Sequence, residues 1–489
     1  MELTPWNKYT LLSFDGGGMR GYASLLILEA LMNHISQVES DPEAMKEEAS
    51  VVPEVPQGIN ASSFHPQYRH SSVCEETETN ALDNFLPCHY FDCIIGTSTG
   101  GLIAIMLGRL RMTVSEAKSQ YESLGGDVFG SPRLFNCLRL PPFFWPRSKY
   151  DHLRLEDVVK GVVKQYDSSL DEPNGFPNAS FSKTEHDLCK TVVTSVGKVF
   201  TPGHKPVTRN DKTYLFQTYD SPTLGKPGDL NPKRAFKGPV WTVARACTAA
   251  PTYFDPEMVE ALNGNLWYFK DGGMRVNNPC RTGVDELVSW GPENNPDGAI
   301  DSVVSIGTGY HYYTLFGSGT AGGLSDTLAA ITGAAVGSTD TEDVHDQLRK
   351  QFGLYHERKY WRFNSDSPDW QNIRLDQCDG KTMEKMRTLI SNYVQRHNTE
   401  EELRACARRL VRCRRQRYAA DPDKWERFAL ASQYRCMMPG CFSRYDLGSD
   451  FRHHFEHSHP AGPALEASYE RLIWKHPHLK VSAETIMPT

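Results

Sequence analysis

Short apolar runs that end in glycine turns and lead into helical segments restrict the fold of this sequence most strongly. Residues 9–15 form such a run, which ends at a glycine cluster; large apolar residues then recur at near-helical spacing over residues 21–38. Residues 91–96 repeat the arrangement before a helix predicted over residues 100–110. Each unit is therefore predicted to be a buried strand, a tight turn and a helix.

Similar elements recur along the next two hundred residues or so. Strands alternating with helices indicate an α/β fold with a largely parallel sheet flanked by helices. The further strands are predicted over 188–196, 213–219, 266–271 and 301–306, and the further helices over 115–124, 241–248 and 278–290.

Composition excludes several classes of protein. The 489 residues are 39% hydrophobic, enough for a substantial core, and the net charge of -7 gives no reason to expect non-specific attraction to nucleic acid or anionic membranes. The N-terminal residues do not resemble a signal peptide, and no apolar run reaches about 18 residues. The 12 cysteines are scattered rather than clustered as in a small disulfide scaffold. We predict a cytoplasmic protein whose membrane contact, if it has one, is peripheral.

The composition changes at several points, which suggests domain boundaries. An acidic stretch rich in small polar residues and proline reads as an insertion. A later helix carries seven arginines within residues 399–418, which predicts a solvated face or a surface that docks a partner. The predicted divisions are an α/β domain (1–375, with the polar insertion 39–88), a basic helical linker (376–430), a Cys- and His-rich region (431–462) and a tail (463–489).

The segment Gly96–Gly100, with sequence GTSTG, lies at a predicted junction between strand and helix. Small residues permit a strained turn that lifts the oxygen of Ser98 above the sheet. The start of the following helix favours negative charge that develops nearby. By itself the pentapeptide is weak, because glycine and serine turns are common; its context makes Ser98 a candidate nucleophile.

A second glycine turn spans residues 15–21, with sequence DGGGMRG. Consecutive glycines let the backbone amides of Gly16, Gly17 and Gly18 point at a single oxygen, as a tetrahedral acyl intermediate requires. The simplest alternative is a glycine-rich turn in which Arg20 is solvated.

The same turn formally matches a dinucleotide-binding fingerprint through Gly16, Gly18 and Gly21. Glu39 or Asp41 would then supply the acid that binds a ribose. Residues 39–88 show no clear second strand to present that acid, which argues against a dinucleotide-binding enzyme.

A third motif, Asp271-Gly272-Gly273, follows an apolar strand. A D-G pair alone indicates only a tight turn. Its significance comes from its order after the other two motifs.

In that order, the three motifs resemble those of the patatin-like phospholipase family. The resemblance extends to residues 245–254 (RACTAAPTYF), 277–279 (NNP) and 305–309 (SIGTG), and it covers residues 1 to about 375. Cys247 stands where that family has a serine, at no expected catalytic position. The resemblance implies a three-layer α/β sandwich and a lipid acyl hydrolase.

The resemblance also implies roles for individual residues. Ser98 would attack the ester carbonyl, Asp271 would be its base, and Gly16, Gly17 and Gly18 would hold the oxyanion. Arg20 would orient the loop or bind a phosphate, although an ordinary surface ion pair remains an equal alternative. No catalytic Ca²⁺ is expected, because such a dyad needs no metal and no acidic calcium loop is evident. The substrate would be a phospholipid or a related acyl ester.

Two further expectations accompany this reading. A Ser-Asp-His triad is the alternative to this dyad. It would need a histidine, and the sequence does not single out one among those that follow Asp271. The aromatic segment 143–145 could cover the acyl pocket or touch a membrane, although ordinary packing is the simpler explanation. The candidate histidines are His311, His345 and His356.

A separate motif near the C-terminus has the spacing of a C2H2 zinc site, C-x4-C-x12-H-x4-H. Tyr445 and Phe451 stand where such fingers place core residues. Resemblance to these fingers implies a structural, tetrahedral Zn²⁺, with His453 and His457 as rival ligands. The predicted ligands are Cys436, Cys441, His454 and His459.

The finger also raises an alternative, non-enzymatic function. A lone finger offers little affinity for DNA, and the expected base-contacting positions, Leu447, Asp450 and His453, include no arginine. DNA is therefore an unlikely partner, even if the basic helix added phosphate contacts. A role in protein interaction or in stability is favoured over DNA binding.

Overall fold

The computed structural model describes most of the predicted α/β region and parts of the C-terminal region. The described residues are 4–40, 85–130, 132–133, 148–166, 177–182, 188–200, 211–223, 233–260, 266–292, 297–310, 341–354, 357–430, 432–436, 441, 443–445, 450, 453–454, 457–458 and 469–473. The aromatic segment 143–145, most of the predicted insertion, His311 and His356 lie outside them.

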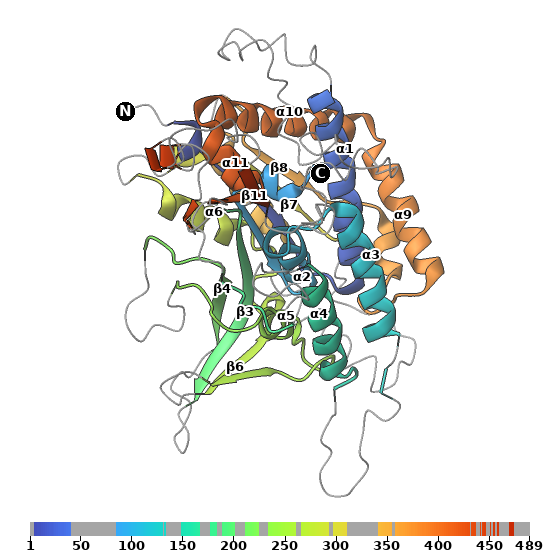
Figure 1. Ribbon diagram of the computed structural model, residues 1–489. Helices are drawn as coiled ribbons and strands as arrows, with labels where there is room; N and C mark the ends of the chain where they lie inside the picture. Colours follow the sequence, from blue (N-terminus) through green and yellow to red (C-terminus); the bar gives the residue numbers. More distant parts are fainter. Residues whose placement is uncertain are drawn as a thin grey trace, which may run out of the picture.

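A mixed eight-stranded sheet forms the centre of the molecule (Figure 1). Its strand order is β5-β6-β3-β2-β1-β7-β8, and β4 pairs with β3. Strands β3, β2, β1, β7 and β8 are mutually parallel, whereas β4, β5 and β6 join by antiparallel pairing. The predicted largely parallel sheet is thus present from β3 to the edge strand β8, while the part formed by β4, β5 and β6 is antiparallel. The strands are β1 (Tyr9–Phe14), β2 (Cys93–Thr97), β3 (Lys190–Phe200), β4 (Lys212–Gln217), β5 (Glu257–Glu260), β6 (Leu266–Asp271), β7 (Ile300–Ile306) and β8 (Tyr360–Phe363).

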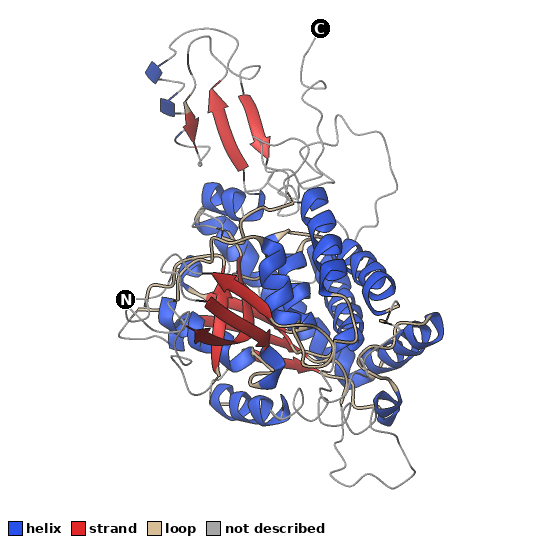
Figure 2. Ribbon diagram, turned by 90° about the horizontal axis from the view of Figure 1, so that it is seen from below, coloured by secondary structure: helices blue, strands red, loops and turns tan. Residues whose placement is uncertain are grey.

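Helices cover both faces of this sheet (Figure 2). Because side chains alternate along a strand, Leu12 of β1 joins a core on one face and Leu11 joins a second core on the other. The first face is covered by α1 (Gly21–Ser40), α2 (Thr99–Ala104), α3 (Val114–Leu124), α4 (His152–Tyr166) and α5 (Val240–Thr248), and the second by α6 (Cys280–Trp290) and α8 (Thr341–Phe352).

Local sequence explains several element boundaries. Helix α3 begins with a capping box, in which Thr113 accepts from the Glu116 amide while Glu116 accepts from the Thr113 amide. Helix α2 continues as a π-helical turn over Ile105–Arg109, so the predicted helix 100–110 is present with changed hydrogen bonding. The central strands are buried on both faces, which accounts for their unbroken apolar runs.

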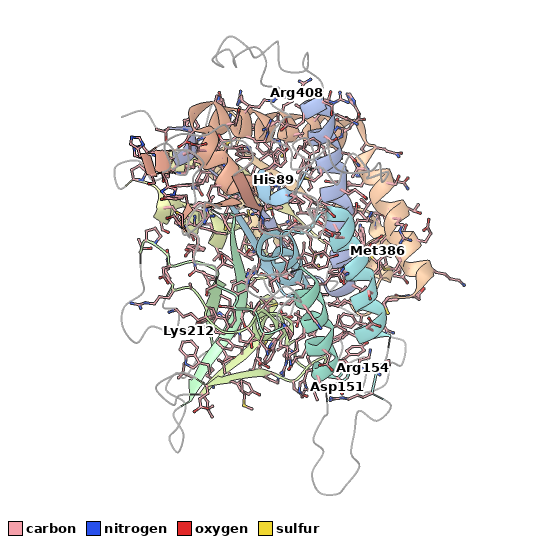
Figure 3. All side chains as sticks on the ribbon, viewed as in Figure 1. His89, Asp151, Arg154, Lys212, Met386 and Arg408 are labelled. Carbon is pink, nitrogen blue, oxygen red and sulfur yellow. The ribbon has the colours of Figure 1, made fainter. Side chains whose placement is uncertain are left out.

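The predicted basic helical linker (376–430) contains three helices, as its helical character suggested, and these helices pack onto the α/β body. Met386 of α9 and Leu410 of α10 are buried in the same core as α1, while Arg408 projects outward (Figure 3). This region therefore shares a core with the domain predicted over residues 1–375. The three helices are α9 (Gly380–Val394), α10 (His397–Ala420) and α11 (Pro422–Leu430).

Acidic partners take up much of the arginine-rich charge of α10. Arg414 and Arg415 pair with Glu39, and the Arg417 Nη2 lies 2.6 Å from the Asp92 Oδ2. Arg409 pairs with Asp301, with 2.7 Å between Nη2 and Oδ1. The prediction of a solvated or docking face was therefore wrong for the inner side of α10. The ion pairs on this side hold α10 against the sheet and α1.

The same contacts correct the start of the predicted insertion. Glu39 lies in the last turn of α1, where it is 6% exposed, and residues 85–88 resume the buried core. Sequence reasoning assigned Glu39 to a solvated segment because it could not detect a partner 375 positions away. Residues 41–84 lie outside the described residues.

A small three-stranded sheet lies near the C-terminus, outside the main body (Figure 2). Its central strand β9 (Ser432–Cys436) pairs antiparallel with β10 (Arg444–Tyr445) and with β11 (Tyr469–Ile473). The β9–β10 pair lies within the residues predicted to form a zinc finger, whereas β11 is an additional strand that the sequence did not suggest.

Within the described part of the chain, every helix is too short or too polar to cross a bilayer.

Candidate active site

Strands β2 and β6 bring Ser98 and Asp271 together because they meet end to end on β3. Thr97, the last residue of β2, pairs with Thr194 of β3. The next residue of β3, Ser195, pairs with Asp271, the last residue of β6. The parallel strand and the antiparallel strand thus end at neighbouring positions. Two residues far apart in the sequence therefore become adjacent.

The side chains of Ser98 and Asp271 form a buried hydrogen-bonded pair. The Ser98 Oγ donates to the Asp271 Oδ2 at 2.6 Å, and the two residues are 6% and 1% exposed. The Gly273 amide donates to the other carboxylate oxygen at 2.7 Å and fixes its orientation. Burial raises the pKa of Asp271 to about 6, although both hydrogen bonds oppose the rise. A base of this strength can accept a serine proton far better than an ordinary aspartate.

The turn that carries Ser98 is strained, as expected for a nucleophile on a tight bend. Ser98 has a φ of 53°, in a region that non-glycine residues rarely occupy. A Cβ on Gly96 would lie 2.0 Å from the Gly100 carbonyl oxygen. Glycine is therefore required at that position for the strand to turn directly into α2.

The glycine loop lies beside this turn, but its three amides are not equivalent. The Gly16 amide donates to the Asn277 carbonyl oxygen at 3.1 Å, so it is not available to a substrate. Among the described residues, no protein acceptor binds the amides of Gly17 and Gly18. The Gly16 amide is therefore already bound within the protein, whereas the amides of Gly17 and Gly18 fit the predicted oxyanion site better.

Contacts from distant segments hold this loop in place. The Gly18 carbonyl accepts hydrogen bonds from the Tyr121 hydroxyl at 2.6 Å and the Thr99 hydroxyl at 3.0 Å. The Met19 amide donates to the Leu375 carbonyl at 2.6 Å. Gly18 itself has a φ of 57°. Three hydrogen bonds with other segments therefore hold residues 18 and 19 of the loop.

Arg20 belongs to this holding arrangement. It is 5% exposed, and its Nε donates to the Ile373 carbonyl at 2.9 Å. A surface ion pair is thus contradicted, and the contact favours a role in orienting the loop over one in binding a substrate phosphate.

Asn277 connects the glycine loop to the segment that follows Asp271. Its carbonyl accepts from the Gly16 amide, and its Nδ2 donates to the Gly16 carbonyl at 3.3 Å. The preceding carbonyl, of Val276, accepts from the Thr97 hydroxyl at 2.8 Å. One segment therefore aligns the base, the serine turn and the glycine loop.

The structure contradicts the dinucleotide-binding alternative. Glu39 lies 18 residues beyond Gly21 along α1, a distance of about 27 Å in a helix. Its carboxylate already accepts from the Tyr90 hydroxyl at 3.0 Å and pairs with Arg414. It cannot bind a ribose at the glycine loop. Asp41 lies outside the described residues.

A triad containing His345 is likewise unsupported. The His345 Nδ1 lies 3.0 Å from the hydroxyl of Tyr360, the first residue of β8. Strand β8 is an edge strand of the sheet, and β7 and β1 separate it from β2. Asp271 makes its hydrogen bonds to Ser98 and Gly273 instead. Among the described residues, Asp271 thus pairs with Ser98 and makes no contact with His345.

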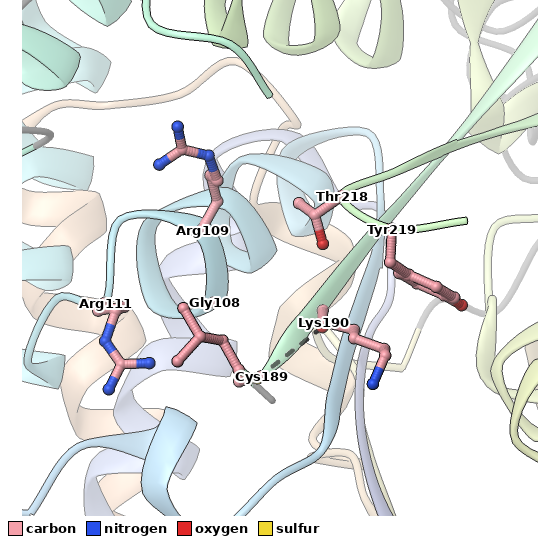
Figure 4. Close-up of a pocket in the computed structure, with 8 residues that line it drawn as sticks. Gly108, Arg109, Arg111, Cys189, Lys190, Thr218 and Tyr219 are labelled. Carbon is pink, nitrogen blue, oxygen red and sulfur yellow. Dashed lines mark hydrogen bonds between the residues drawn. The ribbon is translucent and has the colours of Figure 1, made fainter. Parts of the chain in front are cut away.

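A hollow beside the first residue of β3, away from the dyad, does not extend the site (Figure 4). Arg109, Arg111 and Lys190 line it, but it has room for about one water molecule. Arg109 donates to the Phe181 carbonyl and Arg111 to the Ala429 carbonyl, so these guanidinium groups are engaged in the fold. The hollow has the space of a hydration site rather than of a ligand site.

The predicted zinc ligands are only partly described. The Cys441 Sγ lies 3.4 Å from the His454 Nε2, and the His454 ring packs on Tyr445 with 5.0 Å between centroids. Cys436 ends β9, but its side chain, like His459, lies outside the described residues.

Part of this chain is similar in sequence to a known family of proteins. Residues 70–283 match the patatin-like phospholipase family. Over 334 residues the chain is 28% identical to calcium-independent phospholipase A2-gamma of Rattus norvegicus, covering 67% of this chain and 37% of that protein. It is 28% identical over 342 residues to phospholipase A I of Arabidopsis thaliana, covering 63% and 24%.

The chain covers a larger share of a bacterial relative. The cGAMP-activated phospholipase of Vibrio cholerae is 27% identical over 251 residues, covering 50% of this chain and 60% of that protein. The chain spans about a third of the length of the mammalian relatives. Together the matches show that residues 70–283 are similar to the patatin-like phospholipase family, and that these relatives of the chain are named as phospholipases.

Proposed function

We propose that this protein is a serine acyl hydrolase that releases fatty acid from phospholipids or related acyl esters. The observation that carries the proposal is the 2.6 Å hydrogen bond from Ser98 to a buried Asp271. The adjacent amides of Gly17 and Gly18, which have no acceptor among the described residues, supply the second requirement of acyl transfer.

In the proposed mechanism, Asp271 accepts the hydroxyl proton as the Ser98 Oγ attacks the ester carbonyl. The carbonyl oxygen becomes an oxyanion that the Gly17 and Gly18 amides bind. When the intermediate collapses, the alcohol leaves with the proton held by Asp271, and the acyl group stays on Ser98. Asp271 then deprotonates a water molecule that attacks the acyl-enzyme. Fatty acid leaves, and the proton returns to the Ser98 oxygen.

The substrate class rests on the named relatives, because the described residues do not specify a lipid. The relatives include phospholipases from a mammal, a plant and a bacterium. The mammalian relative is called calcium-independent, which agrees with a dyad whose described atoms need no metal. We therefore propose phospholipid hydrolysis without Ca²⁺, by a cytoplasmic protein that contacts membranes peripherally.

The purified chain is expected to release fatty acid from mixed phospholipid vesicles equally well in excess chelator and in added Ca²⁺. A fluorophosphonate should label Ser98 covalently, because such reagents require an activated serine next to an oxyanion site. Fatty-acid release and mass spectrometry of the labelled peptide provide the two measurements.

Ser98→Ala is the control for both measurements, and its thermal unfolding should match that of the wild type. Labelling of a different serine, or fatty-acid release that survives in Ser98→Ala, would place the active site elsewhere. Activity that disappears in chelator and returns with Ca²⁺ would overturn the metal-free mechanism.

We further propose that Cys436, Cys441, His454 and His459 bind a structural Zn²⁺. Tetrahedral bonds of about 2.3 Å to sulfur and about 2.0 Å to nitrogen place two such ligands about 3.5 Å apart. The 3.4 Å between the Cys441 Sγ and the His454 Nε2 fits this requirement. Four protein ligands would leave no open position for catalysis, so the metal would hold the β9–β10 hairpin against the His454 segment.

The purified chain is expected to contain one equivalent of zinc, and Cys441→Ser is expected to lose it because a thiolate ligand is removed. Cys378→Ser is a matched control, since Cys378 is partly exposed and lies outside the finger. Metal analysis by mass spectrometry provides the measurement. Equal zinc content in both variants would contradict the assignment.

A further inference from the structure

A buried ion pair lies directly behind the glycine loop. Arg362 of β8 binds both carboxylate oxygens of Asp15, with distances of 3.0 Å and 2.7 Å to Oδ1 and Oδ2. Both side chains are 3% exposed. Strand β7 lies between β1 and β8, and the Arg362 Nη1 also donates to the Ser305 hydroxyl of β7 at 2.9 Å. The Arg362 side chain therefore reaches from β8 across β7 to Asp15, which follows β1.

A second layer fixes the guanidinium in turn. The Arg362 Nη2 lies 2.9 Å from the Oε1 of Glu342, in the first turn of α8. Asn364 donates to the same oxygen at 3.0 Å and accepts from the Gly309 amide at 2.9 Å. The position of the Arg362 side chain is thus set by β7, β8 and α8 together.

Asp15 in turn fixes the start of the glycine loop. Its amide donates to the Ile306 carbonyl at 3.1 Å, and its side chain is held by Arg362. The next residue, Gly16, is clamped by Asn277 on both its amide and its carbonyl. Asp15 therefore enters the loop with its backbone and side chain both fixed.

The Arg362–Asp15 pair also affects the charge close to the oxyanion site. Gly17 is two residues from Asp15, at most about 7 Å along the chain. A lone buried carboxylate at this distance would oppose the negative charge that develops on an oxyanion bound by the Gly17 amide. Burial raises the pKa of Asp15 to about 6, and Arg362 opposes that rise. The carboxyl is therefore ionised at pH 8 and requires a neutralising partner.

We propose that Arg362 is a positioning residue for the oxyanion site: it holds Asp15 so that the Gly17 and Gly18 amides face Ser98, and it neutralises the Asp15 carboxylate. Arg362 lies outside residues 70–283, so the family match does not reach it. The inference rests on the proposed acyl-hydrolase function. It adds to that function a residue that acts through the loop and does not touch the substrate.

Arg362→Gln is expected to lower kcat for a soluble acyl ester at pH 8 by between about tenfold and about a hundredfold, with little change in KM. The loss falls on kcat because the oxyanion forms only in the transition state. In the double variant Asp15→Asn/Arg362→Gln, no lone carboxylate remains, and part of the lost kcat should return. Steady-state kinetics of the full chain measure both effects.

The Glu39–Arg414 pair provides a matched control, because it is also buried but joins α1 to α10 away from the loop. Arg414→Gln should lower the thermal unfolding temperature as much as Arg362→Gln does, yet keep the wild-type kcat. Arg362→Lys, which preserves the charge but not the paired hydrogen bonds, should fall between wild type and Arg362→Gln. It also provides the test if Arg362→Gln does not fold.

Two outcomes would overturn the proposal. One is a wild-type kcat in Arg362→Gln, or in Arg362→Lys if only that variant folds. The other is a double variant no more active than Arg362→Gln, which would assign the pair to stability alone. Failure of the underlying function is distinguishable, because Ser98→Ala would then retain ester hydrolysis in the same assay.

Discussion

Asp271→Asn is expected to lower kcat by about 10⁴-fold, because the variant keeps the shape of the side chain but removes the base. The Gly273 amide can still donate to the amide oxygen of asparagine, so the turn after β6 should persist. Ser98 would lose the carboxylate that accepts its proton at 2.6 Å. Fatty-acid release under saturating substrate measures the loss, and an unchanged unfolding temperature shows that the fold is intact.

The same residue predicts the acid limb of the pH profile. Asp271 must be ionised to act as a base, and burial raises its pKa to about 6. Activity should therefore be full above that value and decline as the pH falls through it. Asp15 also has a pKa of about 6, so the wild-type limb can be steeper than one proton requires, and Asp15→Asn should reduce its slope.

Asp285→Asn provides a control carboxylate on α6 that contacts Arg281 and lies away from the dyad. It should retain the wild-type kcat and pH profile. If Asp271→Asn kept more than about a hundredth of the wild-type kcat, Asp271 would not be the general base. An acid limb centred near pH 4 would show instead that Asp271 is as accessible to water as an ordinary aspartate.

Local patterns predicted the two turns that carry Ser98 and Asp271, whereas the roles of these residues came from the order of the motifs and the family resemblance. Each follows a short apolar strand and occupies a glycine turn, and both turns are present where expected. The hydrogen bond between them was inferred from family resemblance. Its structural cause, the meeting of β2 and β6 on β3, depends on strand order, which no local pattern contains.

Long-range partners account for what the sequence could not provide. The arginines of α10 look like a solvated basic face when only their own helix is considered. Glu39 and Asp92, which neutralise three of them, lie more than 300 positions earlier. Arg362 likewise stands in no recognisable motif. Its importance appears only when β8 is placed two strands from β1.

The glycine loop shows a finer limit. All three glycines satisfied the same conformational argument, yet the Gly16 amide is taken by Asn277. A sequence identifies residues whose backbone can turn toward a ligand, but not which amides another carbonyl has already bound. Residues 277–279 could have signalled this contact, because they belong to the family resemblance although no role was assigned to them.

Gly18→Ala is expected to lower kcat by between about 10²-fold and about 10³-fold, the cost of losing an oxyanion donor. An added Cβ would lie 2.1 Å from the Leu375 carbonyl oxygen, a backbone atom that cannot rotate away. The loop must therefore move, and the bond from the Met19 amide to the same oxygen must lengthen. The left-handed φ of 57° adds a smaller strain of roughly 1 kcal/mol.

Gly161→Ala is the matched control, because a Cβ there would meet nothing within 4 Å and the residue lies on the distant helix α4. It should keep the wild-type kcat and raise stability by up to about 1 kcal/mol, since alanine favours a helix. The decisive comparison is between binding and turnover. Gly18→Ala should leave KM nearly unchanged while kcat falls, because the displaced amides bind an oxygen that is negative only in the transition state. A rise in KM with constant kcat would mean that the loop binds the substrate itself, and the oxyanion role of Gly18 would be wrong.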